Sequence, residues 1–297
     1  MEAVINRKTV NGKRYYEIQE DVNGELITRL YPSITTVLGE TSDKSGLEDW
    51  RNKVGHEEAD RISKLSMNRG TIMHRLIELY KPLEGSPEAK LEQLKQIAAE
   101  DAEVNQFNTE QNGQIWLNAG WEMFMKFWYN HSRFFSRVRN VLEAETFLWS
   151  NKGGGYAGTV DNVSELIDNK VLIIDYKNSR KPKREDWIQD YFIQGSAYWV
   201  AYWERSGVKP DGVEIWIANE IQDCPQVFSL TNEDVKIYFR LFQERLQTFK
   251  QKFKETNLYK SVTNETAQVI ECKICNTIIY PVTVSYTHLT LPTIYSV

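Results

Sequence analysis

Two acidic side chains and a lysine lie where neighbouring β-strands would bring them together. Asp175 and Lys177 stand two residues apart in the apolar segment LIIDYKN, and Asp161 lies upstream in AGTVDNV. Because side chains alternate faces along a strand, Asp175 and Lys177 project to the same side of a sheet. A hairpin between the two segments would place Asp161 beside Asp175. Two carboxylates with a backbone carbonyl and waters make a site suited to Mg²⁺ or Mn²⁺.

This set of groups suits the hydrolysis of a phosphodiester bond. A divalent cation lowers the pKa of its bound water and offsets the negative charge that builds up around phosphorus, and a nearby ammonium stabilises the same oxygens. We therefore expect Asp161 and Asp175 to hold the cation and Lys177 to contact the attacking water and the phosphate. The alternative is that an isolated Asp-x-Lys is only the solvated end of an apolar strand, so the rest of the chain has to decide.

The spacing of apolar residues and turn signals predicts the elements that position these side chains. Residues 13–30 are predicted to form a β-hairpin around Asn23-Gly24. Helical spacing dominates from there to about residue 130, with breaks near Gly55, Gly70 and Asn112-Gly113, and β-rich segments follow. The expected helices are 33–39, 47–79, 87–130, 184–205 and 231–255, and the expected strands are 141–150, 155–166, 170–178, 213–218 and 226–230.

This order predicts an α/β fold with a mixed central sheet flanked by helices and an N-terminal helical extension. We divide the chain into a hairpin (1–30), a helical region packed on the core (31–140), the core (141–258), a C-terminal segment (259–283) and a tail (284–297). The tail contains VSYTHLTLPT, which resembles the translation of a sequencing adapter. We expect this tail to be an artefact and the natural chain to be truncated near Thr283.

Composition and charge narrow the class of protein. The formal net charge of −5 argues against a passive nucleic-acid coat, although an enzyme can confine its positive charge to a groove. No apolar run approaches the roughly 20 residues of a bilayer span, and the N-terminus has no apolar signal segment, so we expect a cytoplasmic protein without membrane contact. The basic run KNSRKPKR either contacts DNA phosphates or forms a solvated loop. Its expected DNA contacts are Arg180, Lys181, Lys183 and Arg184.

Several segments give the chain a resemblance to a known family. YPSITTVL (31–38), RGTIMHRLIE (69–78), GTVD (158–161), DYKNS (175–179) and QGSAY (194–198) occur in this order. They resemble motifs of the RecB-like branch of the PD-(D/E)XK nuclease superfamily, to which the mitochondrial genome maintenance exonuclease, CRISPR-adaptation nucleases and phage exonucleases belong. The resemblance covers about residues 31–203 and implies a restriction-endonuclease-like core.

The resemblance implies roles for individual residues. Asp161 and Asp175 would be metal ligands, and Lys177 would be the catalytic lysine. His74 would complete the metal shell through an imidazole nitrogen. Apart from the resemblance, Glu143 and Glu145 share one face of the preceding strand, and one of them, Glu145 in our prediction, would be a further acidic member of the site. The alternative is a solvated strand face.

Other positions keep two interpretations. Gln194 and Tyr198 share one helical face, and they either orient DNA or the active-site strand, as the resemblance implies, or pack the helix on the sheet. Arg69 is either a phosphate contact or an ion-pair partner. Asn178 stands where the family commonly has threonine, and we expect activity to persist because asparagine keeps a hydrogen-bonding side chain. Three nearby aromatic residues would stack on unpaired bases or belong to the core: Trp187, Tyr191 and Phe192.

The cysteines indicate no disulfide framework, because the chain has only three of them. Cys272 and Cys275 have the spacing of half a zinc ribbon, so Zn²⁺ is expected there only if the chain is truncated. Some RecB-like relatives hold an iron–sulfur cluster, which needs four cysteines, and we expect no cluster here.

The sequence therefore predicts a Mg²⁺- or Mn²⁺-dependent DNA exonuclease of replication, repair or recombination, from a bacterium or phage. DNA is the expected substrate, and a recombination or replication protein is the expected partner. Two alternatives remain. One is a catalytically idle DNA-binding relative within a repair or recombination complex. The other is an endonuclease of the same fold, which would normally add a base-reading element that the sequence does not show.

Overall fold

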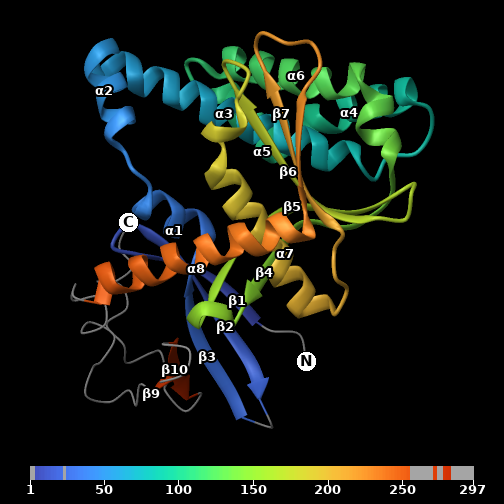
Figure 1. The fold of residues 1–297 in the computed structure, drawn as a ribbon. Helices are drawn as coiled ribbons and strands as arrows, with labels where there is room; N and C mark the ends of the chain where they lie inside the picture. Colours follow the sequence, from blue (N-terminus) through green and yellow to red (C-terminus); the bar gives the residue numbers. More distant parts are fainter. Residues whose placement is uncertain (1–3, 23–24, 255–269, 273–276, 282–297) are drawn as a thin grey trace.

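The computed structural model describes residues 4–22, 25–254, 270–272 and 277–281, which form two five-stranded sheets and a set of helices (Figure 1). The strands are β1 (Val4–Val10), β2 (Lys13–Val22), β3 (Glu25–Pro32), β4 (Val138–Ser150), β5 (Tyr156–Leu166), β6 (Val171–Ser179), β7 (Gly212–Asn219), β8 (Gln226–Thr231), β9 (Ile270–Cys272) and β10 (Thr277–Pro281). The α-helices are α1 (Ile34–Thr41), α2 (Ser45–Val54), α3 (His56–Tyr80), α4 (Pro87–Glu100), α5 (Ala102–Asn105), α6 (Gly113–Tyr129), α7 (Gln189–Ser206) and α8 (Asn232–Lys254). Short 3-10 turns occur at Gln106–Thr109, His131–Arg133, Phe135–Arg137, Lys152–Gly154 and Glu185–Trp187.

The central sheet has the strand order β4-β5-β6-β7-β8. Strands β4, β5 and β6 pair antiparallel, β6 and β7 pair parallel, and β8 is antiparallel to β7. Helix α7 supplies the crossover that a parallel pair requires. Every residue of β7 is buried, as expected for a strand covered on both faces. The predicted α/β fold with a mixed sheet flanked by helices is therefore confirmed.

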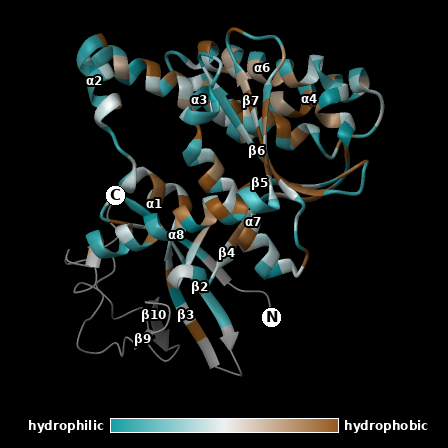
Figure 2. Cartoon of the chain, viewed as in Figure 1, coloured by the Kyte–Doolittle hydropathy of each residue, from teal (hydrophilic) through white to brown (hydrophobic). Residues whose placement is uncertain are grey.

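Helices cover both faces of this sheet. Helices α7 and α8 pack on one face around Ile173, Val213 and Ile215, and α3 and α6 pack on the other around Ile174 and Trp216. Figure 1 shows α3 and α6 on the side of the sheet away from α8, and in Figure 2 hydrophobic residues concentrate along β5 and β7. Among the described residues, no helix combines the length and the apolar character that crossing a bilayer demands.

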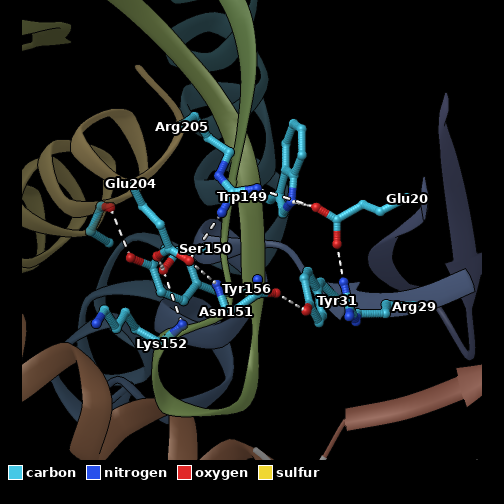
Figure 3. A network of polar contacts seen from close by, with 11 residues as sticks. Glu20, Arg29, Tyr31, Trp149, Ser150, Asn151, Lys152, Tyr156, Glu204 and Arg205 are labelled. Atoms are coloured by element: carbon cyan, nitrogen blue, oxygen red, sulfur yellow. Dashed lines mark hydrogen bonds and ion pairs between the residues drawn. The ribbon is translucent and has the colours of Figure 1, made fainter. Parts of the chain in front are cut away.

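The N-terminal sheet is tied to the core through a polar network (Figure 3). Glu20 on β2 forms an ion pair with Arg29 on β3, and it accepts hydrogen bonds from Trp149 Nε1 (3.1 Å) and Arg205 Nη1 (3.2 Å). The Tyr31 hydroxyl donates to Asn151 at the end of β4. Because these contacts join β2, β3, β4 and α7, they hold the N-terminal sheet against the end of the central sheet.

Several predicted boundaries shift for local reasons. The predicted helix over 47–79 is two helices, α2 and α3, because the chain leaves helical geometry at Gly55 (φ 90°), whereas α3 continues through Gly70. The predicted helix over 87–130 stops first at Glu100, where Asp101 accepts a hydrogen bond from the Val104 amide and caps α5. Strands β2 and β3 pair as the predicted hairpin, although its turn at Asn23-Gly24 lies outside the described residues.

Gly155 generates a stability prediction. Its φ is +91°, and an added Cβ would lie 2.0 Å from the Tyr31 ring, whereas Gly12 has a similar φ of +72° with open space around it. We expect Gly155→Ala to lower the free energy of unfolding by more than about 3 kcal/mol, and Gly12→Ala by only about 1 to 2 kcal/mol, because Gly12 adds backbone strain without a clash. Urea unfolding of both variants measures the difference, and equal losses would contradict the steric argument.

Candidate metal-dependent active site

The site lies where β5 and β6 separate. These strands pair from Glu165–Val171 to Asn162–Ile174. Beyond that point β5 continues with β4, with a single bridge from Ala157 to Ser33, and β6 continues with β7. The separation leaves the peptide groups of Tyr176 without a backbone partner on β5. The Tyr176 N–H donates instead to Asp161 Oδ2 (2.8 Å), and its carbonyl oxygen lies 2.8 Å from His74 Nε2. At this separation of β5 and β6, which we call the fork, side chains thus replace the hydrogen bonds between the strands.

Helix α3 positions the His74 imidazole. Ile72, Met73 and Leu76 bury one face of this helix, while His74 is half-buried and points at the fork. Because Nε2 faces a carbonyl oxygen, it carries the proton, and Nδ1 points to Asp161 Oδ2 at 3.5 Å and to Glu145 Oε1 at 3.9 Å. A backbone partner that fixes one nitrogen in this way is typical of metal-ligating histidines.

Glu145 adds a second carboxylate to this group. The β4–β5 ladder pairs Ala144 with Asn162 and Thr146 with Val160, so Glu145 lies opposite Asp161. Its φ is +47°, a left-handed conformation that a non-glycine residue adopts at a cost of about 1 to 3 kcal/mol. Such strain often marks functional positions. One ligand atom each from His74, Glu145 and Asp161 lies within 4.8 Å of the others, which is close enough for all three to bind one cation.

Asp175 lies next to this group and is the most buried of the carboxylates, with 1% of its surface exposed. Continuing the β5–β6 register by one residue sets it opposite Asp161, on the same face of the sheet. Its Oδ2 forms an ion pair with the Lys177 ammonium, whereas within the described part of the chain its Oδ1 has no hydrogen-bond donor. Burial raises the pKa of Asp175 to about 6; Lys177 opposes this rise and Asp161 adds to it.

The charges around the fork favour a bound cation. Burial lowers the pKa of His74, but the carboxylates of Asp161 and Glu145 outweigh this effect and leave the pKa raised. A position that attracts a proton in this way also attracts a metal ion. Two carboxylates and an imidazole, with the incompletely satisfied Asp175 beside them, are a donor set that a divalent metal ion fits.

Lys177 is held at the edge of the cluster. Its ammonium is paired with Asp175 and lies 5.3 Å from the centroid of the Tyr191 ring. Burial lowers the pKa of Lys177, but Asp175 and Asp161 more than compensate, so the pKa is raised and the side chain stays charged at neutral pH. Lys177 is therefore equipped to stabilise negative charge and not to accept a proton.

Arg69 and Gly70 position the residue that follows the lysine. Arg69 is 1% exposed, its Nε donates to Asn178 Oδ1 (2.7 Å), and its Nη1 forms an ion pair with Glu220. A Cβ at Gly70 would lie 2.5 Å from Asn178 Nδ2, so only glycine lets α3 approach β6 this closely. Of the two interpretations of Arg69, the structure shows the ion pair. Contact between Arg69 and phosphate stays a prediction. The Arg69 guanidinium is buried in this structure.

Helix α7 closes the other side of the fork. Tyr198 is 2% exposed, and burial, with smaller effects of Asp161 and Asp175, raises its pKa well above the ordinary value. Tyr198 therefore lies close to both carboxylates inside the packed interface, and Gln194, half-buried one turn earlier, opposes the rise in that pKa. The structure favours a packing role for Tyr198, and a role of either residue in orienting DNA remains a prediction.

The basic run leaves β6 and reaches the surface. Arg180 and Lys181 are exposed, the Lys183 amide donates to Gln226 Oε1 (2.7 Å), and Arg184 pairs with Asp186. The three aromatic residues differ in burial: Trp187 is 61% exposed, Tyr191 is half-buried beside Lys177, and Phe192 is 1% exposed in the core. Base stacking therefore remains open for Trp187 and is ruled out for Phe192 by its burial. DNA contact by the basic residues stays a prediction.

One side chain near the site was not predicted from the sequence, and two predicted features fall where the structure does not describe the side chains. Lys81 lies at the end of α3 with its Nζ 4.9 Å from the centroid of the Tyr176 ring, and no motif in the sequence marks it. The predicted zinc pair Cys272 and Cys275 falls on residues whose side chains the structure does not describe, and the tail 284–297 also lies outside the described residues.

Comparison with known proteins identifies the family. The model of the PD-(D/E)XK nuclease superfamily matches residues 46–278, which is more than half of the chain, and the chain belongs to this superfamily. It is therefore a member of a nuclease family, as the motifs predicted. No curated protein matches the sequence significantly.

Two solved structures are similar to the chain at a low level. One is a candidate exonuclease from Eubacterium rectale, with 14% identity, 70% of this chain and 73% of that chain covered, and a TM-score of 0.43. The other is the protein SSO0001, with 14% identity, 64% of this chain and 84% of that chain covered, and a TM-score of 0.29.

The cluster predicts which side chains set the affinity for a metal ion. We expect His74→Ala and Glu145→Gln each to weaken Mn²⁺ binding at least about tenfold, because each removes one of three converging ligands. Isothermal titration calorimetry with Mn²⁺ measures the change. His56→Ala, at an exposed position at the start of α3, is the matched control and should bind as the unmodified protein does. Unchanged affinity in both site variants would contradict the assignment.

Proposed function

We propose that this protein is a Mg²⁺- or Mn²⁺-dependent DNA exonuclease that acts in replication, repair or recombination, alongside a partner protein of the same process. The observation that carries the hydrolytic part is the cluster at the β5–β6 fork, where His74, Glu145 and Asp161 converge beside the Asp175–Lys177 ion pair. The exonuclease part rests on the resemblance of the motifs to the RecB-like branch. An idle relative would have no need to retain this complete set.

The residues of the chain divide the work of hydrolysis. His74, Glu145 and Asp161 would hold the ion, with Asp175 adjacent, and the bound ion supplies an acidified water and neutralises phosphate charge. The Lys177 ammonium stays protonated beside Asp175, so it stabilises the phosphoryl oxygens as negative charge grows. The Asp161 and His74 contacts to the Tyr176 peptide fix the ligands before the substrate arrives.

The substrate preference can be tested directly. The purified protein is incubated with end-labelled linear DNA and with covalently closed circular DNA, in Mg²⁺ or in EDTA. The proposal expects degradation of linear DNA only, in Mg²⁺ only. Cleavage of closed circles would show an endonuclease instead, and retained DNA binding without any cleavage would show the idle relative.

Two substitutions separate the roles of the ion pair. We expect Asp175→Ala to abolish cleavage while DNA binding is retained, because it disturbs the metal site and releases Lys177. We expect Lys177→Met to lower kcat by about 10²- to 10³-fold, the usual loss for one transition-state charge contact, with Mn²⁺ still bound. Asp168→Ala, at the exposed β5–β6 turn, is the matched control. Full activity in either site variant, measured by single-turnover cleavage, would refute its role.

A further inference from the structure

A cavity of about 680 Å³ lies beside the metal cluster and is not used in the roles described above. The end of α3, strand β4 and Tyr176 line it, together with the buried polar side chains of Asn162 and Ser164. A second, polar groove of about 480 Å³ runs along α3 past His74 and Glu145, and Glu78 borders both spaces. Each space is large enough for a ligand of nucleotide size.

Lys81 connects this cavity to the reacting centre. It follows His74 by seven residues, which is two helical turns and about 10 Å along the same face of α3. Its Nζ lies over the ring of Tyr176, the residue whose peptide groups are held by Asp161 and His74. The cavity therefore begins directly behind the fork.

In the part of the chain that the structure describes, the charge of Lys81 lacks a counter-ion. Within the described residues the Lys81 ammonium takes part in no ion pair or hydrogen bond, although the side chain is half-buried over the Tyr176 ring. Burial lowers the pKa of Lys81 to about 8, and the more distant carboxylates of Asp161, Glu145 and Glu78 only partly offset this effect. Lys90, which also lines the cavity, is likewise half-buried over the Tyr80 ring, and burial lowers its pKa. Two carboxylates also line the cavity, but Glu78 is paired with Arg75 and Glu143 accepts a hydrogen bond from Thr146. The partly desolvated Lys81 and Lys90 ammonium groups therefore favour an anionic ligand.

We propose that this cavity binds the nucleotide unit next to the scissile phosphate, with Lys81 contacting the phosphate of that unit. This assignment rests on the proposed function, because it takes the fork as the place of cleavage. The phosphate supplies the missing counter-ion of Lys81, and the sugar and base occupy the space lined by Tyr80, Phe135 and β4. Lys81 acts here as a binding residue and does not touch the reacting atoms.

The test uses deoxyadenosine 5′-monophosphate as the probe, in EDTA so that no metal ion contributes. Isothermal titration calorimetry on the full chain should show binding, and deoxyadenosine without phosphate should bind at least tenfold more weakly. We expect Lys81→Met to lose at least tenfold in affinity for the nucleotide and Lys81→Arg to keep most of it. Lys236→Met, at an exposed position on α8, is the matched control and should bind normally. Absent binding, or equal binding by Lys81→Met in a folded state verified by circular dichroism, overturns the proposal.

A second measurement separates this proposal from the proposed function. In cleavage of a single-stranded oligonucleotide, Lys81→Met should raise KM about tenfold and change kcat less than twofold, which is the signature of lost uniform binding. Asp175→Ala should keep nucleotide affinity while losing cleavage. If the protein binds the nucleotide through Lys81 but cleaves no DNA, the proposed function fails and the cavity assignment stands. If it cleaves DNA but its nucleotide binding does not depend on Lys81, the cavity assignment fails and the proposed function stands.

Discussion

Strand β5 leaves strand β6 while each is still paired on its other side, and the site depends on this separation. Two buried peptide groups of Tyr176 would lose their partners there, at a cost of about 1 to 3 kcal/mol each. Asp161 and His74 satisfy them. The same hydrogen bonds fix the imidazole tautomer and aim Asp161 at His74 Nδ1. The same two contacts therefore satisfy the Tyr176 peptide and orient the candidate metal ligands Asp161 and His74.

The electrostatics follow from this packing. Asp161, Glu145 and Asp175 converge on one place, where Asp175 is buried and Glu145 is open to solvent, and this concentration of negative charge is unfavourable unless positive charge joins it. Lys177 supplies part of it, and the raised pKa values of His74 and Lys177 show that the cluster attracts more. The acidic total charge of −5 is thus compatible with a nucleic-acid substrate, because a cation bound at the candidate site would join the basic residues beside it in supplying positive charge locally.

The strand arrangement and the grouping of Asp161, Asp175 and Lys177 could be predicted from the sequence, because these residues lie on segments whose apolar patterns mark them as strands. The sequence could not show which carboxylate joins His74 and Asp161 and which one pairs with Lys177. The distances place Glu145 with His74 and Asp161, whereas Asp175 pairs with Lys177, and this depends on a left-handed backbone at Glu145 that no residue pattern signals. Arg69 was ambiguous for a similar reason, because burial by a distant segment decides between a phosphate contact and an ion pair. Lys81 belongs to no motif, and only the end of α3 brings it to Tyr176.

Helix α3 determines how accurately these parts meet. One continuous helix carries Arg69, which holds Asn178, then His74, which holds Tyr176, and its end carries Lys81 on the face of His74. The close approach of Gly70 to Asn178 fixes the helix against β6, so a slide of α3 along the sheet would break all of these contacts together. His74, Lys81 and Arg69, which holds Asn178, therefore share one rigid support. A change in how α3 packs should alter metal binding and nucleotide binding jointly, even where no site residue is replaced.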